Sequence, residues 1–375
     1  MKYRYGLYPR WHGDRQALYD FAIECSENSR MDSVVPLFAV DVCSTIRSEC
    51  DDGQSMIWND PRMYEKLKNV LDHSTYYGTS KSAIRHISST RAAFFATTGH
   101  WNEARKAVDA TDAPLDQAVV AAIVERMARD LRGMILANTG PTGANVLRAQ
   151  KLHADGKREP ALAIYRAALK SNKDPDALLH LNGLILNVQR EIDFAAGKQV
   201  SLQPDARFTG IEGYKGRWNL NKEGGFVGVC TSQQRLRVVY PADFGDAWEL
   251  KTEFGFGVHR ATWDVAGVLL VMPAGKEDLG VVIQSDPAAL LIRVGQSNDL
   301  AVAQAAVLPG INTMTVRRDG KMLTVLLNGQ QLFSGPVLAH DPQHQARIGL
   351  GGNPIYRGDT VHYKSVTIHK LSLKA

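Results

Sequence analysis

Between Ile311 and Phe333, apolar residues alternate with polar ones on either side of two short turn sequences. In the runs 314–316 and 323–327 every second residue is apolar, so each run can turn one face toward a core. The turns contain Asp319-Gly320 and Asn328-Gly329, dipeptides that tolerate the positive φ angles of a two-residue hairpin loop. The pattern therefore predicts a three-stranded antiparallel meander with Gly320 and Gly329 at positive φ.

Short apolar runs separated by turn signals continue through the rest of the second half of the chain. Many short strands at this spacing are typical of an antiparallel β-sandwich. In addition to the meander, the expected strands are 218–220, 225–227, 236–240, 248–256, 265–270, 280–284, 289–294, 347–352 and 361–368. We expect Trp218 and Trp248 in the core of this sandwich, because each begins a strand and aromatic residues dominate such packing.

The first half instead follows the 3.6-residue period of amphipathic helices. Two segments share one helix-turn-helix pattern, in which a helix ends at a turn glycine and a small residue lets a second helix approach. Its residues are Ala92, Phe95, Gly99, Ala104 and Val108, and they recur 57 positions later as Ala149, Leu152, Gly156, Ala161 and Tyr165.

The two copies should be joined by one long helix from about Leu115 to Leu136, which Gly140-Pro141-Thr142-Gly143 stops. A further helix is expected from Ala177 onward and should fade near residues 193–197. The segment 201–205 then reads as a linker, so we predict a helical domain over 1–200 and a β domain over 201–375.

Both halves resemble known families. The duplicated pattern, completed in its second copy by Ala168 and Pro175, resembles the tetratricopeptide unit, whose usual period is about 34 residues. The opening Pro9-Arg10-Trp11 with Gly13 is similar to that of an uncharacterised bacterial family of helical domains. These resemblances imply a tetratricopeptide-like helical array that binds a peptide or a partner protein.

In the second half, a meander ending in Asn-Gly is followed by the strand 347–352 and a final strand, 361–368. This order resembles the concanavalin A-like lectin/glucanase sandwiches, including laminin-G-type modules. The segment 243–254 followed by 265–269 also looks like sugar-processing relatives, among them those named for 3-keto-disaccharide hydrolysis. The resemblance implies a concanavalin A-like jelly roll that binds or processes carbohydrate.

Composition narrows the function classes only slightly. Of the 375 residues, 44% are hydrophobic and 22% charged, and the formal net charge is +5. These values fit an ordinary globular protein without a nucleic-acid surface, and no apolar run is long enough to cross a membrane. The start shows no secretory signal, so we expect a cytoplasmic protein, or a secreted or cell-surface one if the natural chain begins upstream. The cysteines are expected as free buried thiols, with a Cys43–Cys50 bridge as the alternative.

Catalytic motifs are missing from the sequence. Glycosidases of the sandwich class pair carboxylates on one strand, and the nearest candidates here are Glu249 and Glu253, with Lys251 between them. Four residues of about 3.3 Å separate them by about 13 Å, more than either glycosidase geometry uses. His340 and His344 fit a polar loop, and Asp51-Asp52-Gly53 fits a solvated turn. We therefore predict no catalytic residues, no cofactor and no metal site.

The stretch with most recognition potential is the loop 258–264, between two strong strands. It groups Trp263, Arg260, His259 and Asp264. Sugars bind where an aromatic face stacks on the ring and a few oriented polar groups contact the hydroxyls. The competing interpretation makes Trp263 a core residue and Arg260 with Asp264 a surface ion pair.

Together these patterns favour a non-catalytic binding protein. The sandwich would bind a glycan and the helical half a protein or peptide. The alternatives are a hydrolase related to the sugar-processing sandwiches and a purely structural scaffold, because one fold hosts many functions.

Overall fold

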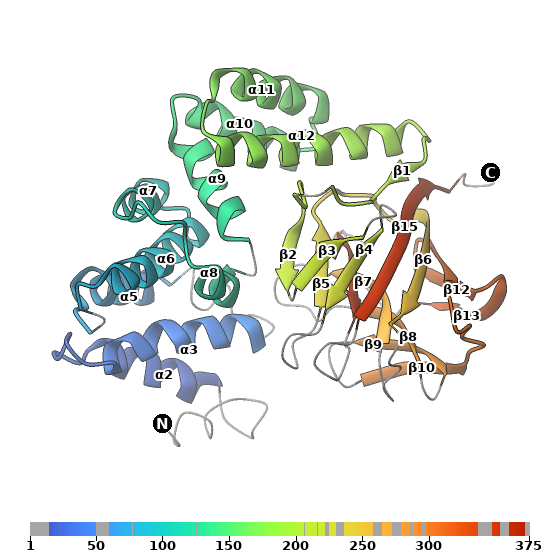
Figure 1. The fold of residues 1–375 in the computed structure, drawn as a ribbon, viewed down its shortest axis with the longest axis horizontal. Helices are drawn as coiled ribbons and strands as arrows, with labels where there is room; N and C mark the ends of the chain where they lie inside the picture. Colours follow the sequence, from blue (N-terminus) through green and yellow to red (C-terminus); the bar gives the residue numbers. More distant parts are fainter. Residues whose placement is uncertain are drawn as a thin grey trace. The chain divides into compact units, whose positions relative to one another are not determined.

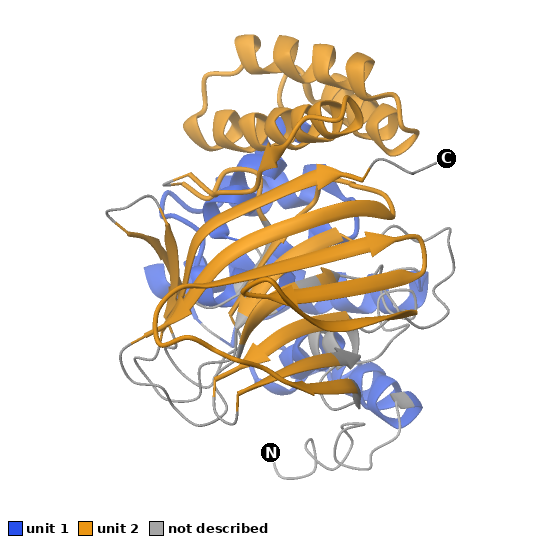
Figure 2. Ribbon diagram, turned by 90° about the vertical axis from the view of Figure 1, so that its right-hand side faces the viewer, with its two compact units in different colours: residues 1–139, 274–276 blue, residues 140–273, 277–375 orange. Residues whose placement is uncertain are grey.

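The computed structural model describes residues 15–49, 60–76, 78–124, 127–205, 207–215, 217–221, 225–229, 236–257, 265–271, 279–285, 288–294, 298–336, 347–352 and 360–371. The chain divides into two compact units, coloured separately in Figure 2. Unit 1 comprises residues 1–139 and 274–276, and unit 2 comprises 140–273 and 277–375. The described secondary structure of unit 1 is helical, and that of unit 2 consists of three helices and two antiparallel sheets.

The helices of unit 1 are α2 (Arg15–Ser26), α3 (Val35–Glu49), α5 (Pro61–His73), α6 (Lys81–Thr97), α7 (Trp101–Asp109), α8 (Gln117–Val124) and α9 (Ala128–Thr139) (Figure 1). Side-chain caps fix two of their starts. The side chain of Asp60, the residue before Pro61, accepts from the backbone N–H of Arg62. The side chain of Ser80 accepts from the backbone N–H of Ala83. Cys25 and Cys43 are buried free thiols, whereas Cys50, the partner in the alternative Cys43–Cys50 bridge, lies outside the described residues.

The single helix expected from 115 to 136 is wrong, because the structure has two helices there, α8 and α9. The backbone N–H of Ala128 donates to Oε1 of Gln117 over 2.8 Å, which gives α9 a capped start of its own. Both helices pack against the α6–α7 hairpin, so tertiary contacts outweigh the continuous apolar stripe of the sequence.

Unit 2 begins with α10 (Gly143–Ala154), α11 (Arg158–Ser171) and α12 (Pro175–Ala195). The change from helix to strand falls between Ala195 and Val200, as the sequence pattern predicted. These three helices nevertheless belong to the same compact unit as the sheets. Whether a fragment beginning at residue 201 folds by itself, as the boundary at 200 implies, stays a prediction.

The duplicated pattern forms two helical hairpins, α6–α7 and α10–α11. Gly99 and Gly156 have φ angles of +77° and +75°. In each turn, the residue after the glycine donates its N–H over 2.8 Å to a carbonyl of the preceding helix, that of Phe95 or of Leu152. Such a closure is the usual glycine-ended helix cap. Ala104 and Ala161, the small residues of the pattern, are both fully buried.

The first sheet contains eight strands in the order β13-β12-β11-β6-β15-β4-β3, and β1 pairs with the far end of β15. Its strands are β1 (Val200–Ser201), β3 (Arg217–Leu220), β4 (Phe226–Val229), β6 (Ala247–Phe256), β11 (Asn312–Asp319), β12 (Met322–Leu327), β13 (Gln330–Pro336) and β15 (Thr360–Lys370). The predicted meander is β11-β12-β13, and Gly320 and Gly329 have the expected positive φ, +55° and +83°.

The second sheet contains seven strands in the order β10-β9-β8-β7-β14-β5-β2. They are β2 (Glu212–Lys215), β5 (Leu236–Tyr240), β7 (Val265–Val271), β8 (Leu279–Gln284), β9 (Ala289–Val294), β10 (Asn298–Gln304) and β14 (Arg347–Gly352). Every strand expected from the sequence is present, whereas β1, β2 and β10 were not expected. The predicted two-sheet sandwich is therefore confirmed as an architecture.

The core lies between the two sheets. Trp248 is fully buried and Trp218 is 4% exposed, as predicted. Tyr363 of β15 connects the sheets through its phenol, whose single O–H is shared between the carbonyls of Gly351 at 2.6 Å and Gly267 at 3.0 Å. The same oxygen accepts from the Gly267 N–H at 3.0 Å. This buried hydroxyl is thus fully paired and fixes β15 against β7 and β14.

The helix α12 packs directly on the sandwich. A Cβ atom at Gly183 would lie 2.9 Å from the backbone nitrogen of Gly210, so only glycine permits this approach. Asn187 donates to the carbonyl of Gly210 at 3.0 Å, and Phe194 meets Phe244 edge-on at 5.1 Å between centroids. These contacts join the helices to the sheets within unit 2.

A buried carboxylate completes this junction. Glu191, with a side chain 2% exposed, accepts from His153 Nε2 at 3.0 Å and Arg158 Nε at 2.6 Å. It also accepts from the backbone N–H of Asp243 at 2.9 Å. Burial raises the pKa of Glu191, but the hydrogen bonds from His153, Asp243 and Arg158 outweigh burial and hold it below its usual range.

Candidate functional site

The loop residues expected to bind a sugar, Trp263, Arg260, His259 and Asp264, lie outside the described residues. The same is true of His340, His344 and the Asp51-Asp52-Gly53 turn. The structure does fix both flanks of the loop. Strand β6 leads into it through Gly257, whose N–H donates to the carbonyl of Thr360 at 2.9 Å, and β7 begins after it at Val265.

Strand β6 therefore connects this loop to the outer face of the eight-stranded sheet. Along β6, Trp248, Leu250, Thr252 and Phe254 are buried against the second sheet, as strand alternation requires. The alternate residues point away from the core. We call the outward surface of the three central strands the polar face: Glu249, Lys251 and Glu253 of β6, Thr313, Thr315 and Arg317 of β11, and Ser365, Thr367 and His369 of β15.

The polar face is ordered into cross-strand rows by the register of β11, β6 and β15. One row is Arg317, Glu249 and His369; the next is Thr315, Lys251 and Thr367; the third is Thr313, Glu253 and Ser365. Neighbouring strands lie about 4.8 Å apart, so the side chains of a row are close enough to contact one ligand.

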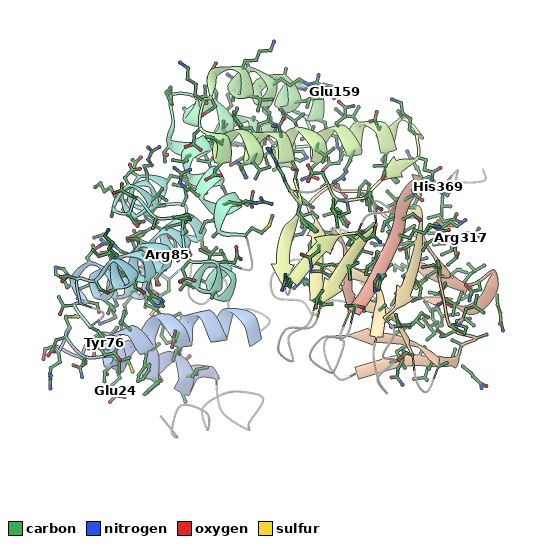
Figure 3. The ribbon with its side chains drawn as sticks, in the orientation of Figure 1. Glu24, Tyr76, Arg85, Glu159, Arg317 and His369 are labelled. Carbon is green, nitrogen blue, oxygen red and sulfur yellow. The ribbon has the colours of Figure 1, made fainter. Side chains whose placement is uncertain are left out.

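In the first row, Glu249 is contacted by side chains from both neighbouring strands. Arg317 Nε donates to Glu249 Oε2, and His369 Nε2 lies 3.8 Å from Glu249 Oε1. Both partners are half-exposed and project from the surface of the sandwich (Figure 3). Arg317 and Glu249 are 68 residues apart in the sequence, so their contact becomes visible only through the strand register.

In the third row, Glu253 has different partners. Ser365 Oγ donates to Glu253 Oε2 at 3.0 Å, and Lys364 Nζ lies 3.9 Å from the same oxygen. Glu249 and Glu253 are thus engaged separately, four residues apart on one strand. This arrangement does not unite them into the close carboxylate pair that glycoside hydrolysis uses.

The polar face ends toward the loop 258–264 in a close approach of two segments. A Cβ atom at Gly255 would lie 3.2 Å from the carbonyl oxygen of Gly310 and 3.4 Å from Cδ1 of Ile311. Opposite Gly255, on β15, stands His362, whose Nε2 is 2.9 Å from Thr360 Oγ1. Partial burial lowers the pKa of His362, so its imidazole is neutral at pH 7 and can both donate and accept hydrogen bonds.

Sequence reasoning missed most of this surface. Alternation along β6 does place Glu249, Lys251 and Glu253 on one side, but Thr315, Thr367 and Ser365 become neighbours only through pairing between distant strands. Within the described ranges, no three His, Cys, Asp or Glu residues gather in a way that could hold a metal ion. None of the described helices is both long and apolar enough to span a bilayer.

Comparison with known proteins finds similarity only among solved structures. No family model and no curated protein matches the sequence. The carbohydrate binding module CBM66 from Bacillus subtilis is 13% identical, with a TM-score of 0.33, and the match covers 41% of this chain and 92% of the module. A protein of unknown function with a galectin-like fold, also from Bacillus subtilis, is 10% identical, with a TM-score of 0.37 and coverages of 46% and 94%.

A beta-1,3-glucanase from Mycobacterium marinum is likewise similar, at 10% identity and a TM-score of 0.32, with coverages of 40% and 77%. These neighbours match the C-terminal part of the chain and are lectin-like, carbohydrate-binding or glucanase sandwiches. Identities and TM-scores of this size carry no argument about ligand or reaction. The chemistry of the site has to come from its residues.

Proposed function

We propose that the β-sandwich binds a glycan on the polar face and in the adjoining loop 258–264. One observation carries the proposal: β6 bears the central residues of the polar face and continues directly into the loop with Trp263. The hydroxyls, carboxylates and cations of the polar face would supply the polar contacts that sugars need, and Trp263 of the loop would supply the aromatic one.

The proposed roles follow from the chemistry of each group. Trp263 would stack on a sugar ring, Arg260 and His259 would donate to hydroxyls or to a carboxylate, and Asp264 would accept from hydroxyls. On the polar face, hydroxyls such as Ser365 and Thr313 can donate and accept. This division makes Trp263 the main source of affinity and the polar face the source of orientation.

The test compares two tryptophans. Trp263→Ala should abolish binding on a glycan array and barely change thermal stability. The matched variant Trp218→Ala empties a core position that is 4% exposed, and it should cost about 3–5 kcal/mol of stability. A folded Trp263→Ala protein with undiminished glycan binding would contradict the role of Trp263. Failure of the wild-type chain to bind any glycan would contradict the function itself.

A hydrolase remains the alternative of a different class, and the same array separates it from a binding protein. Every glycan that binds is incubated with the chain and analysed for new reducing ends. A binding protein should release none. Release that disappears in Glu249→Gln or Glu253→Gln would identify an enzyme instead.

We further propose that the helical hairpins are tetratricopeptide-like units that bind a peptide or a protein. The support is the duplicated turn of α6–α7 and α10–α11, with its matching hydrogen bonds and buried alanines. A peptide array probed with the full chain tests this proposal. A chain that binds no peptide above background would leave the helices with a structural role only.

A further inference from the structure

We infer that the polar face selects an acidic glycan, whose carboxylate or sulfate group is bound by Lys251 together with Thr315 and Thr367. The inference rests on the proposed glycan binding and adds the chemical class of the ligand. It comes from the middle row of the polar face, which the sequence did not connect with binding.

Lys251 is an exposed cation at the centre of a sheet face. In the described part of the chain it takes part in no ion pair and no side-chain hydrogen bond, unlike Arg317 of the polar face and Lys364 of β15. An ammonium group offers three donors and requires acceptors. Lys251 therefore keeps its full donor capacity for a ligand.

The neighbouring strands place a threonine opposite Lys251 on each side. Thr315 of β11 and Thr367 of β15 are the register partners of Lys251, and both are half-buried. Strands about 4.8 Å apart bring such side chains within reach of one group of atoms. A carboxylate or sulfate accepts several hydrogen bonds at once, so it matches one cation flanked by two hydroxyl donors.

The alternative explanation is a ladder in which Lys251 only offsets Glu249 and Glu253. Each carboxylate lies two residues away along β6, about 6.6 Å at the backbone. However, both already have cationic partners from neighbouring strands: Arg317 with Glu249, and Lys364 with Glu253. Because Arg317 and Lys364 balance the negative charges of Glu249 and Glu253, the positive charge of Lys251 has no carboxylate left to balance it among these residues.

The test measures binding of the full chain to two matched pairs of polymers. The pairs are polygalacturonate with its methyl ester, and dextran sulfate with dextran, so that each pair differs in its anionic groups. We expect the acidic member of at least one pair to bind about tenfold more tightly than its neutral partner, the effect of one charge-assisted contact. That preference should weaken as salt is raised.

Three variants assign the preference to the middle row. Lys251→Gln should remove it, whereas Lys251→Arg should retain most of it. Lys321→Gln removes the same charge from the exposed turn between β11 and β12, off the polar face, and should leave binding unchanged. Both positions are exposed, so stability should change little in all three variants.

The outcomes separate this inference from the function on which it rests. Glycan binding on the array without a preference for either acidic polymer, or a preference that survives Lys251→Gln, would overturn the inference and leave the glycan-binding function standing. No binding to the array or to any of the four polymers would overturn the function and the inference with it.

Discussion

The hairpins α6–α7 and α10–α11 have turns of the same conformation but belong to different compact units. Their glycines have φ angles within a few degrees of each other, and the same backbone hydrogen bonds close both turns. The first hairpin packs against α8 and α9, whereas the second leads through α12 to the sandwich. Local sequence thus determines the hairpin but not its surroundings.

The difference lies in α12. Its Gly183, Asn187, Glu191 and Phe194 all contact the sandwich or the segments leading into it. Burial lowers the pKa of a further residue, Arg190, which lies over the ring of Tyr240 at 5.6 Å. A few residues on one helix therefore attach a helical hairpin to a β domain.

The largest effect should come from separating the helices α10–α12 from the β domain. The sequence predicts that 201–375 folds alone as a β domain. The contacts of α12 predict that 140–375 is considerably more stable than 201–375. Circular dichroism and urea unfolding of 1–200, 201–375 and 140–375 compare them. Equal stability of the two β fragments would show that α12 contributes nothing, and substantial helix in 201–375 would contradict the predicted boundary.

Glu191→Ala should break the junction within the full chain. The variant leaves Arg158 and His153 without their acceptor and the Asp243 N–H unpaired, which should cost about 3–5 kcal/mol. Hydrogen exchange by mass spectrometry should show lost protection in α12 and unchanged protection in α6. As a control, Glu159→Ala removes an exposed carboxylate from α11 and should alter stability by at most about 0.5 kcal/mol.

Substitution of the turn glycine should have a smaller effect, which should be equal in the two hairpins. Gly99→Ala and Gly156→Ala each place a side chain at positive φ, where the cost is about 1–2 kcal/mol. No neighbouring atom obstructs a Cβ at either glycine, so backbone strain alone should decide the result. Hydrogen exchange should report similar losses in the two hairpins. Unequal losses would show that their surroundings, and not the turn, set the cost.

Lowering the pH should weaken the contact between α12 and the sandwich, and this effect should be the smallest of the four. The folded pKa of Glu191 lies below the ordinary value of 4.5, so its contribution to stability is complete above that pH and is lost as the pH falls through the folded value. Protection of α12 should therefore decline below about pH 4.5, and Glu191→Gln should remove that part of the decline. An unchanged pH profile in Glu191→Gln would assign the acid response to other groups.

How much of the fold could be predicted depends on how far apart in the sequence the interacting residues lie. The strands around Asp319-Gly320 and Asn328-Gly329 follow from local turn chemistry and alternation, and the structure confirms them. Strand β10 was missed because its Ala, Asn and Gln residues have weak strand propensity and it forms only by pairing with β9. The expected helix over 115–136 failed where tertiary packing outweighed an apolar stripe.

The candidate site was predictable only in part for the same reason. The side shared by Glu249, Lys251 and Glu253 follows from the two-residue period of a strand. The partners of Lys251, Thr315 and Thr367, lie more than sixty residues away, and no local pattern reports their register. Glu191 contacts Arg158 and Asp243, which lie 33 and 52 residues away in the sequence, so its role also had no local signal.

For protein engineering, we expect that the contacts flanking the loop 258–264, among them those of the Tyr363 phenol, allow this loop to be exchanged. Its hydrogen bonds to Gly267 hold β7 just after the loop, and the Gly257 N–H holds the end of β6 to Thr360 just before it. Both anchor points are thus set by hydrogen bonds between residues outside the loop. A display library randomised within the loop should therefore vary ligand preference while the sandwich that carries it stays intact.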